Sequence, residues 1–296
     1  MQFLRSGKVK DVYEDGDHLV FKFSNRISVF DMIIPNEVPD KGASLCRTSS
    51  YWFNQVEKQL GMKTHFLSMQ DPTTMLVRKF KTVERAKSKS EKEYVIPLEF
   101  VIRYYAAGSL LDRLKTGKVL PVDLGMKAKP AHGEKLPEPY FEVTTKFEKF
   151  DRPLSKEEAC EIGGITNSEL ENIFEASLKI DTIIDRNATK SGLIHADGKK
   201  EFALDLNRQP VVVDTFGTAD EDRFWDSQKL STGVVEEYSK EFVRQYYRKI
   251  GYHEKLYSAR TLGKAEPDIP PLPNDMVKEV SALYRKMYEM LTLSRW

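Results

Sequence analysis

One stretch, "KKEFALDLNRQPVVVDTF" at residues 199–216, constrains the fold more than any other part of the sequence. Two runs rich in apolar residues flank a short polar segment, a pattern typical of a β-hairpin. Asn207 and Arg208 form the predicted turn centre, because asparagine tolerates the positive φ that tight hairpin turns require. This turn would place Glu201 directly opposite Asp214, with both carboxylates on the same face of the hairpin.

This acid pair requires an explanation, because like charges that lie directly opposite each other destabilise a sheet. A hard divalent cation such as Mg2+, which prefers oxygen ligands, would neutralise the pair. Lys199, two residues from Glu201 on the same face, would do so from within the chain. In a third interpretation both acids lie on a solvated face, and the hairpin alone leaves all three open.

Length and composition favour one large domain, or two closely packed ones, with a substantial core. Of the 296 residues, 40% are hydrophobic and 11% aromatic, and the formal net charge is +1. This balance argues against a partner bound by the charge of the whole chain, and no run approaches the roughly 18 apolar residues of a membrane helix. The charged N-terminus is unlike a signal peptide, and Cys46 and Cys160 lack metal-ligand spacing. We therefore expect a cytoplasmic protein with reduced thiols.

The order of the expected elements favours an α+β fold with antiparallel sheets over a doubly wound parallel sheet. Residues 8–23 alternate around a central Asp-Gly and predict a second hairpin, and residues 166–192 predict a long amphipathic helix with Ser168 as its N-cap. Further strands are expected at 75–81 and 95–106, further helices at 44–60, 233–250 and 274–291, and loops in the charged run 82–94 and the proline-rich segment 118–154.

The segment "SGKVKDVY" carries residues suited to a polyphosphate. Lys8 and Lys10 point to the same side of a predicted strand, next to the flexible Gly7. A single glycine makes neither a P-loop nor a dinucleotide motif. Two lysines on a strand are also typical of an ordinary solvated face, so this segment alone does not decide between the two interpretations.

The segment "VIRYYAAGSLLDRL" predicts a strand that ends at small residues, followed by a helix that begins at Ser109. Ser109 and Asp112 resemble a capping box, and the small residues leave the first backbone N–H groups open to an anion. Arg103, at the end of the strand, offers a bidentate guanidinium. The segment therefore predicts a monophosphate site, with an ordinary capped helix as the alternative.

In "VVVDTFGTADEDRFWD", Arg223 stands between several acids and an aromatic pair. This arrangement suits a planar anionic substrate, and it also suits a salt-bridge network. Taken together, the lysines, the acid pair and the arginines are typical of ATP-dependent phosphoryl transfer, in which catalysis depends on positioning and charge neutralisation.

Several of these motifs resemble those of the SAICAR synthetase (phosphoribosylaminoimidazole-succinocarboxamide synthase) family. "GLIHADGKKEF" at 192–202 resembles the family's G[LI]I[LI][AV]DTKFEF, and "VDTFGTADEDRFW" at 213–225 resembles VDE[VF]LTPDSSRFW. Similar matches, in the family's order, are "GKVKDVYE" at 7–14, "SNRISVFD" at 24–31, "IPLEFVIRYYAAGS" at 96–109 and "LTLSRW" at 291–296. The resemblance thus runs nearly from end to end.

The resemblance implies an ATP-grasp-like fold with the nucleotide site in the cleft between an N-terminal ATP-binding subdomain, 1–97, and a larger subdomain, 98–296. It implies a ligase of de novo purine biosynthesis that uses ATP and Mg2+. The enzyme would join L-aspartate to the carboxylate of carboxyaminoimidazole ribonucleotide (CAIR) through an acyl phosphate, giving SAICAR. Its partners would be these small molecules, without nucleic acid or membrane, and it would be a monomer or a small homo-oligomer.

The resemblance also implies roles for individual residues. The ATP-binding positions are Gly7, Lys8, Lys10, Glu99 and Lys199. The catalytic positions are Lys199, Glu201 and Asp214, of which the two acids would bind Mg2+. The positions implied for substrate binding are Asp31, Arg103, Ser109, Arg223 and Arg244.

The departures from the family motifs include Thr215 for Glu, Gly198 for Thr, Ala203 for Gly and Asn25 for Asp, and they leave the acid pair unchanged. Two other functions remain as alternatives. A small-molecule kinase of similar architecture would keep the lysines and acids but not the arginines and Ser109 together. A catalytically silent scaffold would use the basic segment 78–92 to contact RNA.

Overall fold

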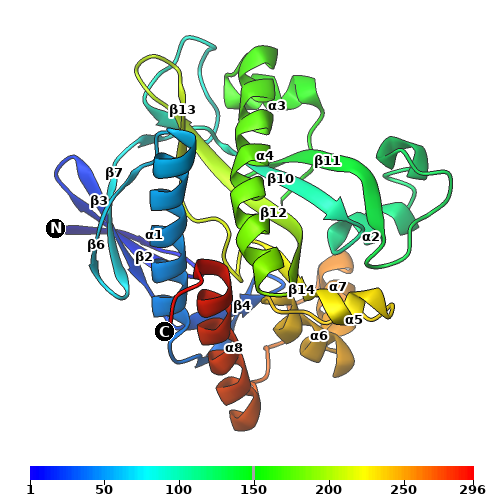
Figure 1. The fold of residues 1–296 in the computed structure, drawn as a ribbon. Helices are drawn as coiled ribbons and strands as arrows, with labels where there is room; N and C mark the ends of the chain where they lie inside the picture. The colour runs from blue at the N-terminus through cyan, green and yellow to red at the C-terminus, as the bar shows by residue number, and fades with distance from the viewer. Residues whose placement is uncertain (149–150) are drawn as a thin grey trace.

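Two sheets and the helices packed against them form the fold in the computed structural model, which describes residues 1–148 and 151–296 (Figure 1). The first sheet is antiparallel and has the order β1-β2-β3-β7-β6. Its strands are β1 (Gln2–Ser6), β2 (Lys10–Asp15), β3 (His18–Phe23), β7 (Thr74–Arg78) and β6 (Phe66–Asp71). A separate hairpin joins β4 (Arg26–Val29) to β5 (Met32–Glu37). The predicted α+β class with antiparallel sheets is confirmed.

The second sheet is built around β12 (Leu193–Leu204), a twelve-residue strand. It pairs antiparallel with four strands: β10 (Leu98–Tyr105), β9 (Tyr94–Val95), β13 (Pro210–Val213) and β14 (Arg223–Asp226). The sheet continues through β11 (Lys135–Thr145) beside β10 and β8 (Lys81–Thr82) parallel to β9. β12 therefore brings its residues next to strands that come from much of the chain after position 80.

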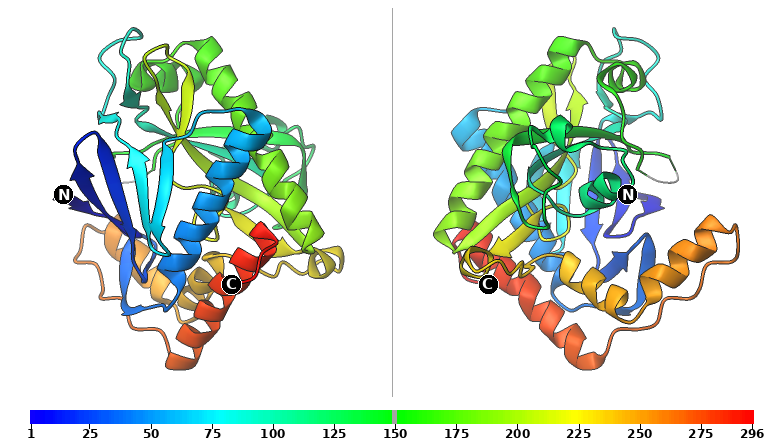
Figure 2. Two further views of the ribbon diagram at one scale, coloured as in Figure 1. Left: turned by 60° about the vertical axis from the view of Figure 1, so that its left-hand side comes forward. Right: turned by 90° about the vertical axis from the view of Figure 1, so that its right-hand side faces the viewer.

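Three long helices lie side by side and join the two sheets (Figures 1 and 2). α1 (Lys41–Leu60) packs on the first sheet, α4 (Asn167–Lys190) packs on β12 and β10, and α8 (Asn274–Thr292) contacts both helices. The smaller helices are α2 (Ser109–Lys115), η1 (Pro121–Leu124), α3 (Lys156–Gly163), α5 (Ser227–Ser231), α6 (Glu241–Lys249) and α7 (Tyr252–Thr261). Among the described residues, no helix has the length and apolarity needed to cross a bilayer.

Buried aromatic side chains connect the helix layer to the loop after β13. Phe53 of α1 packs edge-on against Phe216 with the ring centroids 5.2 Å apart, and the Trp52 indole N–H donates a 2.8 Å hydrogen bond to the Gly217 carbonyl. Gly217 has φ +64°, and a Cβ at this position would lie 2.7 Å from the Trp52 ring. The loop between β13 and β14 is thus held against α1 by packing as well as by charge.

The predicted hairpin at 199–216 is present, but its predicted register is wrong by one residue. Glu201 pairs with Val213, not with Asp214. The turn contains three residues rather than two, with Arg208 in the left-handed conformation at φ 58°. Three-residue hairpin loops commonly end in such a residue. The Asp205 carboxylate stabilises this turn by accepting hydrogen bonds from the backbone N–H groups of Asn207 and Gln209, at 2.8 and 2.9 Å.

Four other expectations are corrected by the structure. The segment 118–154 contains η1 and the eleven-residue strand β11, and the helix expected over 233–250 begins only at Glu241. The N-cap of α4 is Thr166, which forms a capping box with Glu169, and not Ser168. The run 82–94 is largely exposed, but Ala86 and Tyr94 are buried within it. These differences arise where a tertiary contact decides the conformation of a weak local pattern.

We predict that Phe202→Ala destabilises the protein far more than Leu206→Ala on the same hairpin. Phe202 is fully buried with its ring 5.7 Å from that of Phe100, whereas Leu206 at the turn is 58% exposed. Loss of the buried ring should lower the free energy of unfolding by about 3–5 kcal/mol. The exposed substitution should change it by less than about 0.5 kcal/mol. Urea unfolding of both variants checks this, and similar losses would contradict the packing described here.

Candidate functional site

One face of β12 carries a lysine enclosed by three carboxylates. The Lys199 ammonium lies 2.8 Å from Glu99 Oε1, 3.0 Å from Glu201 Oε1 and 3.2 Å from Glu221 Oε2. Burial alone would lower the pKa of Lys199, but the surrounding acids, led by Glu221 and Glu99, raise it well above its usual value. Lys199 therefore remains charged at any physiological pH, and this face of the strand carries a permanent cation.

The predicted acid pair is close in space for a reason that the sequence analysis missed. With Glu201 paired to Val213, a regular strand would turn the next side chain, Asp214, to the opposite face. Asp214 instead adopts φ +61°, which breaks this alternation. One ammonium, that of Lys146, contacts the Glu201 carboxylate and lies 3.8 Å from Asp214 Oδ2. The two acids thus share a cation without being opposed.

Lysines surround Asp214 and keep it ionised. Burial would raise its pKa, but the ammonium groups of Lys10, Lys146 and Lys199 outweigh burial and hold the pKa below its usual range. Lys10 makes a direct ion pair with Asp214. This contact joins β2 of the first sheet to the end of β13 in the second, so the cluster spans both sheets.

Lys146 is a site residue that the sequence analysis did not identify. It directly follows β11, in a segment that was expected to be a loop. Burial lowers the pKa of Lys146 to about 8, although Asp214 offsets part of this effect. The sequence signal was the alternation of "YFEVTTK" at 140–146, which the prolines at 137 and 139 obscure.

The oxygen donors of this cluster fit a divalent cation. Glu201 and Asp214 are both anionic carboxylates of the type that Mg2+ prefers. The Lys146 ammonium shows that a single cation can lie close to both of them. Glu201 and Asp214 would therefore be the ligands of such an ion.

The N-terminal lysines meet different partners. Lys8 forms an ion pair with Asp31, whereas Lys10 reaches Asp214. Lys8 precedes β2 rather than lying on it, and the Gly7 N–H donates a 2.8 Å hydrogen bond to the Lys10 carbonyl across a tight turn. The expectation that both lysines share one strand face is therefore wrong. Asp31 lies in the two-residue turn between β4 and β5, at φ 68°.

The residues of the predicted anion site do come together. Arg103 Nη2 donates a hydrogen bond to Ser109 Oγ at 3.2 Å, and Arg103 Nη1 lies 3.0 Å from Asp197 Oδ2. Arg223 Nη1 lies 2.5 Å from the same carboxylate oxygen. Gly108 is required for this arrangement, because a Cβ there would lie 2.4 Å from Arg223 Nη2. Arg103, Ser109 and Arg223 thus form one group.

The predicted capping box at the start of α2 is wrong. The N-cap residue is Gly108, with φ 55°, and no side chain within the described structure caps it. The Ser109 hydroxyl accepts its hydrogen bond from Arg103 instead, and Asp112 lies 3.7 Å from Lys115. The start of α2 thus has no side-chain cap, and the Arg103 guanidinium contacts its first residue, Ser109.

Arg244, the last of the predicted substrate residues, joins this group through a carboxylate on its own helix. It lies on α6, with Nη1 3.0 Å from Glu241 Oε2. Arg223 Nη2 lies 3.5 Å from the same oxygen. The sequence analysis did not identify Glu241, Asp197 or Glu142 as part of the arginine group.

The departure at Thr215 is explained by a neighbouring acid. The Thr215 hydroxyl donates a 3.3 Å hydrogen bond to Glu221 Oε1, and the other oxygen of Glu221 is the one near Lys199. Position 215 is a glutamate in the family motif, and position 221 is a serine. In this chain Glu221, six residues after position 215, therefore places a carboxylate beside Lys199.

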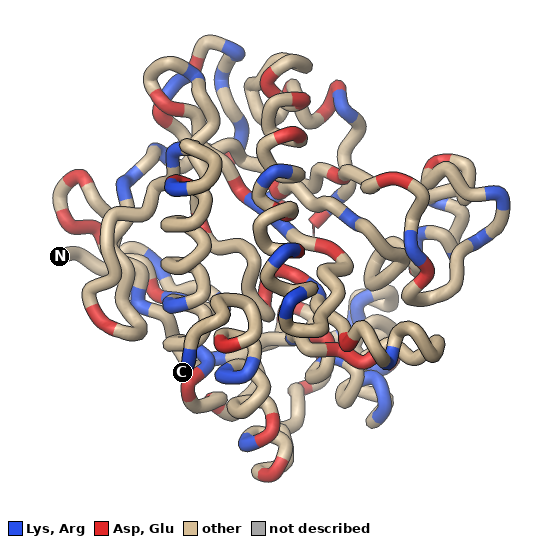
Figure 3. The backbone as a smooth tube through the Cα atoms, viewed as in Figure 1, with Lys and Arg blue, Asp and Glu red and all other residues tan. Residues whose placement is uncertain are grey.

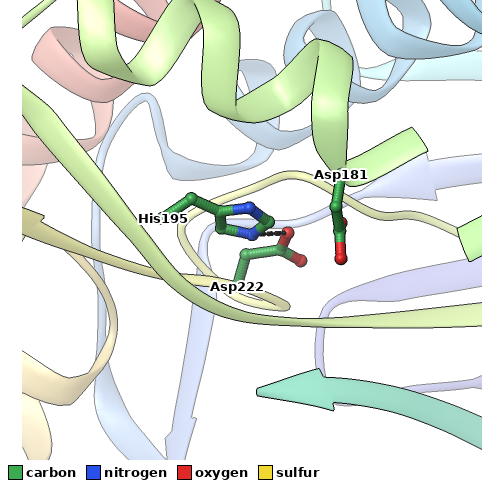
Figure 4. Close-up of side chains that lie close together, drawn as sticks. All are labelled: Asp181, His195 and Asp222. Atoms are coloured by element: carbon green, nitrogen blue, oxygen red, sulfur yellow. Dashed lines mark hydrogen bonds and ion pairs between the residues drawn. The ribbon is translucent and has the colours of Figure 1, made fainter. Parts of the chain in front are cut away.

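The opposite face of β12 carries a second charged cluster, buried under α4 (Figure 4). The Lys200 ammonium is fully buried, pairs with Asp181 of α4 and lies 3.8 Å from Asp222 Oδ2. His195 Nε2 lies 2.8 Å from the same oxygen of Asp222. Asp181, His195 and Asp222 place ligand atoms within 4.8 Å of one another, as a metal site would. The cation beside them, however, is the Lys200 ammonium.

Departures from the family motif meet in this second cluster. His195, Gly198, Lys200 and Asp222 stand where the motifs have an aliphatic residue, threonine, phenylalanine and serine. A Cβ at Gly198 would lie 2.4 Å from Asp222 Oδ2 and 2.6 Å from Lys200 Nζ. Any larger residue at position 198 would therefore have to displace these two charged groups.

We predict that the buried cluster makes the protein more stable at mildly acidic than at alkaline pH. Burial lowers the pKa of His195, but Asp181 and Asp222 more than offset this, so the pKa is raised above that of the unfolded chain. The resulting stabilisation is complete below pH ~6.5 and disappears as the pH rises through the folded-state pKa. His195→Gln should therefore lose more stability relative to the parent at pH 6 than at pH 9. Equal losses in melting temperature at both pH values would show that His195 does not titrate as proposed.

Comparison with known proteins gives a consistent result. The model of the SAICAR synthetase family matches residues 3–259. The phosphoribosylaminoimidazole-succinocarboxamide synthases of Thermoplasma volcanium and Thermoplasma acidophilum are 61% and 57% identical to the chain, and in both cases the alignment covers 100% of both proteins.

Two solved structures share the fold over nearly the whole chain. A SAICAR synthase from Saccharomyces cerevisiae, complexed with SAICAR, has a TM-score of 0.76 at 26% identity, covering 99% of this chain and 95% of that one. A SAICAR synthetase in complex with ADP has a TM-score of 0.70 at 25% identity, covering 99% and 98%.

Proposed function

The chain belongs to the SAICAR synthetase family, an enzyme family of purine biosynthesis, and we propose that it joins L-aspartate to CAIR at the expense of ATP. The products would be SAICAR, ADP and phosphate. The relatives whose structures were solved with SAICAR and with ADP support both the proposed product and the use of a nucleotide.

The observation that carries this proposal is that one face of β12 contacts both the arginine group and the lysine and carboxylate cluster. Asp197, Lys199 and Glu201 follow each other at every second position and so point the same way. Asp197 binds the arginine group, whereas Lys199 and Glu201 belong to the lysine and carboxylate cluster. A ligand with a monophosphate and a ligand with a polyphosphate would therefore be held side by side, as the reaction requires.

The lysine cluster is the proposed ATP site. Gly7, Lys8, Lys10 and Lys199 would contact the phosphates, together with Lys146. Glu99 and its neighbours on β10 would lie beside the adenine. The cleft between subdomains 1–97 and 98–296 is the proposed location, because Lys10 and Asp214 meet across the two sheets.

Glu201 and Asp214 are the proposed Mg2+ ligands. The bound ion would neutralise charge between ATP and the carboxylate of CAIR. In the structure Lys146 contacts both acids, so an ion bound between them would take the place of its ammonium. Lys146 would then be free to bind a phosphate.

The proposed chemistry explains why ATP is needed. A carboxylate is a poor acyl donor because its oxyanion does not leave. Attack of the CAIR carboxylate on the γ-phosphorus forms an acyl phosphate and breaks the bond to ADP. The aspartate amine then attacks the acyl carbon, loses a proton, and expels phosphate. Arg103, Ser109, Arg223 and Arg244 would hold the CAIR phosphate, and Asp31 would contact aspartate or order its turn.

The alternative functions receive less support. A small-molecule kinase has no use for the arginine group, which the structure brings together around Ser109. An RNA-binding role for 78–92 is disfavoured because four cations of that segment are paired with acids. The pairs are Arg78 with Glu93, Lys79 with Glu14, Lys81 with Glu91 and Arg85 with Glu161. A cytoplasmic enzyme acting on soluble substrates remains our proposal.

The decisive experiment is a coupled assay of the purified protein with ATP, CAIR and each amino acid in turn. We expect release of ADP with aspartate and formation of SAICAR, detected by mass spectrometry. Release of ADP with CAIR but independent of any amino acid would favour a kinase, and no release with aspartate would refute the proposal.

We predict that Asp214→Asn lowers kcat/KM by about a hundred-fold or more, because charge stabilisation at the transferred phosphoryl group is lost. Calorimetry should show that Mg2+ strengthens ADP binding to the parent but not to the variant. Asp205→Asn is the matched control, since Asp205 lies on the same hairpin and also pairs with a lysine, Lys63, at 2.6 Å. A Mg2+ effect retained by Asp214→Asn would overturn the metal assignment.

We predict that Arg103→Ala weakens CAIR binding by ten-fold or more while leaving ATP affinity nearly unchanged, because a charge-assisted contact contributes about 1.5–3 kcal/mol. The probe is the nucleoside of CAIR, which lacks the phosphate. The parent should discriminate strongly against it, and the variant much less. Arg103→Ala also leaves Asp197 and Glu142 without their shared arginine. Arg103→Lys controls for this effect, because it keeps a cation beside both acids but lacks the bidentate guanidinium. Full discrimination by Arg103→Ala would place the phosphate elsewhere.

A further inference from the structure

Arginines and carboxylates alternate in one continuous ion-pair network around the proposed phosphate site. The network consists, in order, of Arg113, Glu142, Arg103, Asp197 and Arg223, followed by Glu241, which contacts both Arg244 and Arg248. Five guanidinium groups less three carboxylates leave a formal charge of +2. This excess matches a phosphate monoester, which carries a charge of about −1.5 to −2 at neutral pH.

The three acids of the network and Arg103 are buried, whereas the arginines of α6 are partly exposed. The side chains of Glu142, Asp197 and Glu241 are 4%, 4% and 7% exposed, whereas those of Arg244 and Arg248 are 31% and 39% exposed. The groups of the network that reach solvent most are therefore guanidinium groups rather than carboxylates. A ligand that reaches this surface meets guanidinium groups that are already held in place.

Glu241 contacts more arginines than either of the other two acids. Its Oε2 lies 3.5 Å from Arg223 Nη2 and 3.0 Å from Arg244 Nη1, and its Oε1 binds Arg248. It is the first residue of α6, and Arg244 and Arg248, three and seven positions later, lie on the same side of that helix. Burial would raise the pKa of Glu241, but the arginines lower it to about 2, so the carboxylate is ionised.

We propose that Glu241 is a positioning residue that holds Arg223 and Arg244 in the geometry that binds the substrate phosphate. This inference rests on the proposed function. Three guanidinium groups so close together repel one another, and each has a long flexible side chain. The carboxylate gathers them before the ligand arrives, so less ordering accompanies binding. Through its contact with Arg223, Glu241 also connects α6 to the start of β14.

Two effects of Glu241 act in opposite directions and decide the test. As an anion it repels a phosphate, so its removal would strengthen phosphate binding if charge alone mattered. As an anchor it orders the arginines, so its removal would weaken binding. In this network the arginines outnumber the acids, and the positive excess persists with or without Glu241. We therefore expect the loss of order to prevail.

The test measures KM for CAIR, for its nucleoside and for ATP in Glu241→Ala. We expect KM for CAIR to rise roughly ten-fold, comparable to the loss of one charge-assisted contact, with the KM values for the nucleoside and for ATP within about two-fold of the parent. Glu241→Gln should recover much of the affinity, because its amide oxygen still accepts hydrogen bonds from the guanidinium groups.

A matched control is Glu169→Ala. Glu169 also lies in the first turn of a helix, α4, and holds Arg208 through two contacts of 2.7 and 2.8 Å, away from the β12 site. We expect it to lower the melting temperature without changing the ratio of the KM values for CAIR and ATP. Should Glu241→Ala not fold, Glu241→Asp serves instead, because its shorter side chain does not reach all three arginines.

The outcomes are distinct. The positioning role is overturned if Glu241→Ala leaves the KM for CAIR unchanged or lowers it. It is also overturned if the KM for the nucleoside rises as much as the KM for CAIR. If the parent itself does not discriminate between CAIR and the nucleoside, the proposed phosphate site fails instead. A parent that discriminates, together with a variant that has lost this discrimination, supports both.

Discussion

Asp220, Glu221 and Asp222 are consecutive acids in the loop between β13 and β14, and each lies close to a different lysine. The arrangement of the rest of the site depends on these three contacts. Asp220 lies 2.9 Å from Lys41 of α1, and Glu221 and Asp222 lie 3.2 and 3.8 Å from Lys199 and Lys200 of β12. Unpaired charges are very costly to bury, so the loop has little freedom to move. Because Lys199 and Lys200 point to opposite faces of β12, this loop is tied to both faces of the strand.

The loop's position then determines where the functional groups at its two ends lie. Asp214 at its start joins the lysine cluster, and Arg223 at its end enters the arginine group through Asp197 (Figure 3 shows how closely opposite charges are interspersed along the chain). The near balance of 46 basic and 45 acidic residues is therefore not only a surface property. In the proposed site, acids hold the lysines and arginines in place, and these cations would bind the anionic ligands.

The fold and most site residues were predictable from the sequence because their signals are local or lie in motifs. The hairpins, the long helices and the group around Arg103 follow from such signals. The register at Glu201 was missed because the Asp205 side chain stabilises a longer turn, and the closeness of Asp214 depends on one left-handed residue. β11 was not predicted because it contains two prolines, although an edge strand tolerates them. Lys146, which directly follows β11, was therefore not recognised as a site residue. Glu241 was missed because its contact with Arg223 of β14 becomes apparent only in the folded structure.

The departures from the family motifs follow the geometry of β12. Asp197, Lys199 and Glu201 face the proposed site and match the motif, whereas Gly198 and Lys200 face α4 and do not. The irregularity between His195 and Asp197 places His195 on the α4 side as well, where it meets Asp222. A strand that carries function on one face and packing on the other can therefore change every second residue without altering its chemistry. The altered residues are coupled, because a buried lysine requires its acids, and a larger residue at position 198 would displace both Lys200 and Asp222.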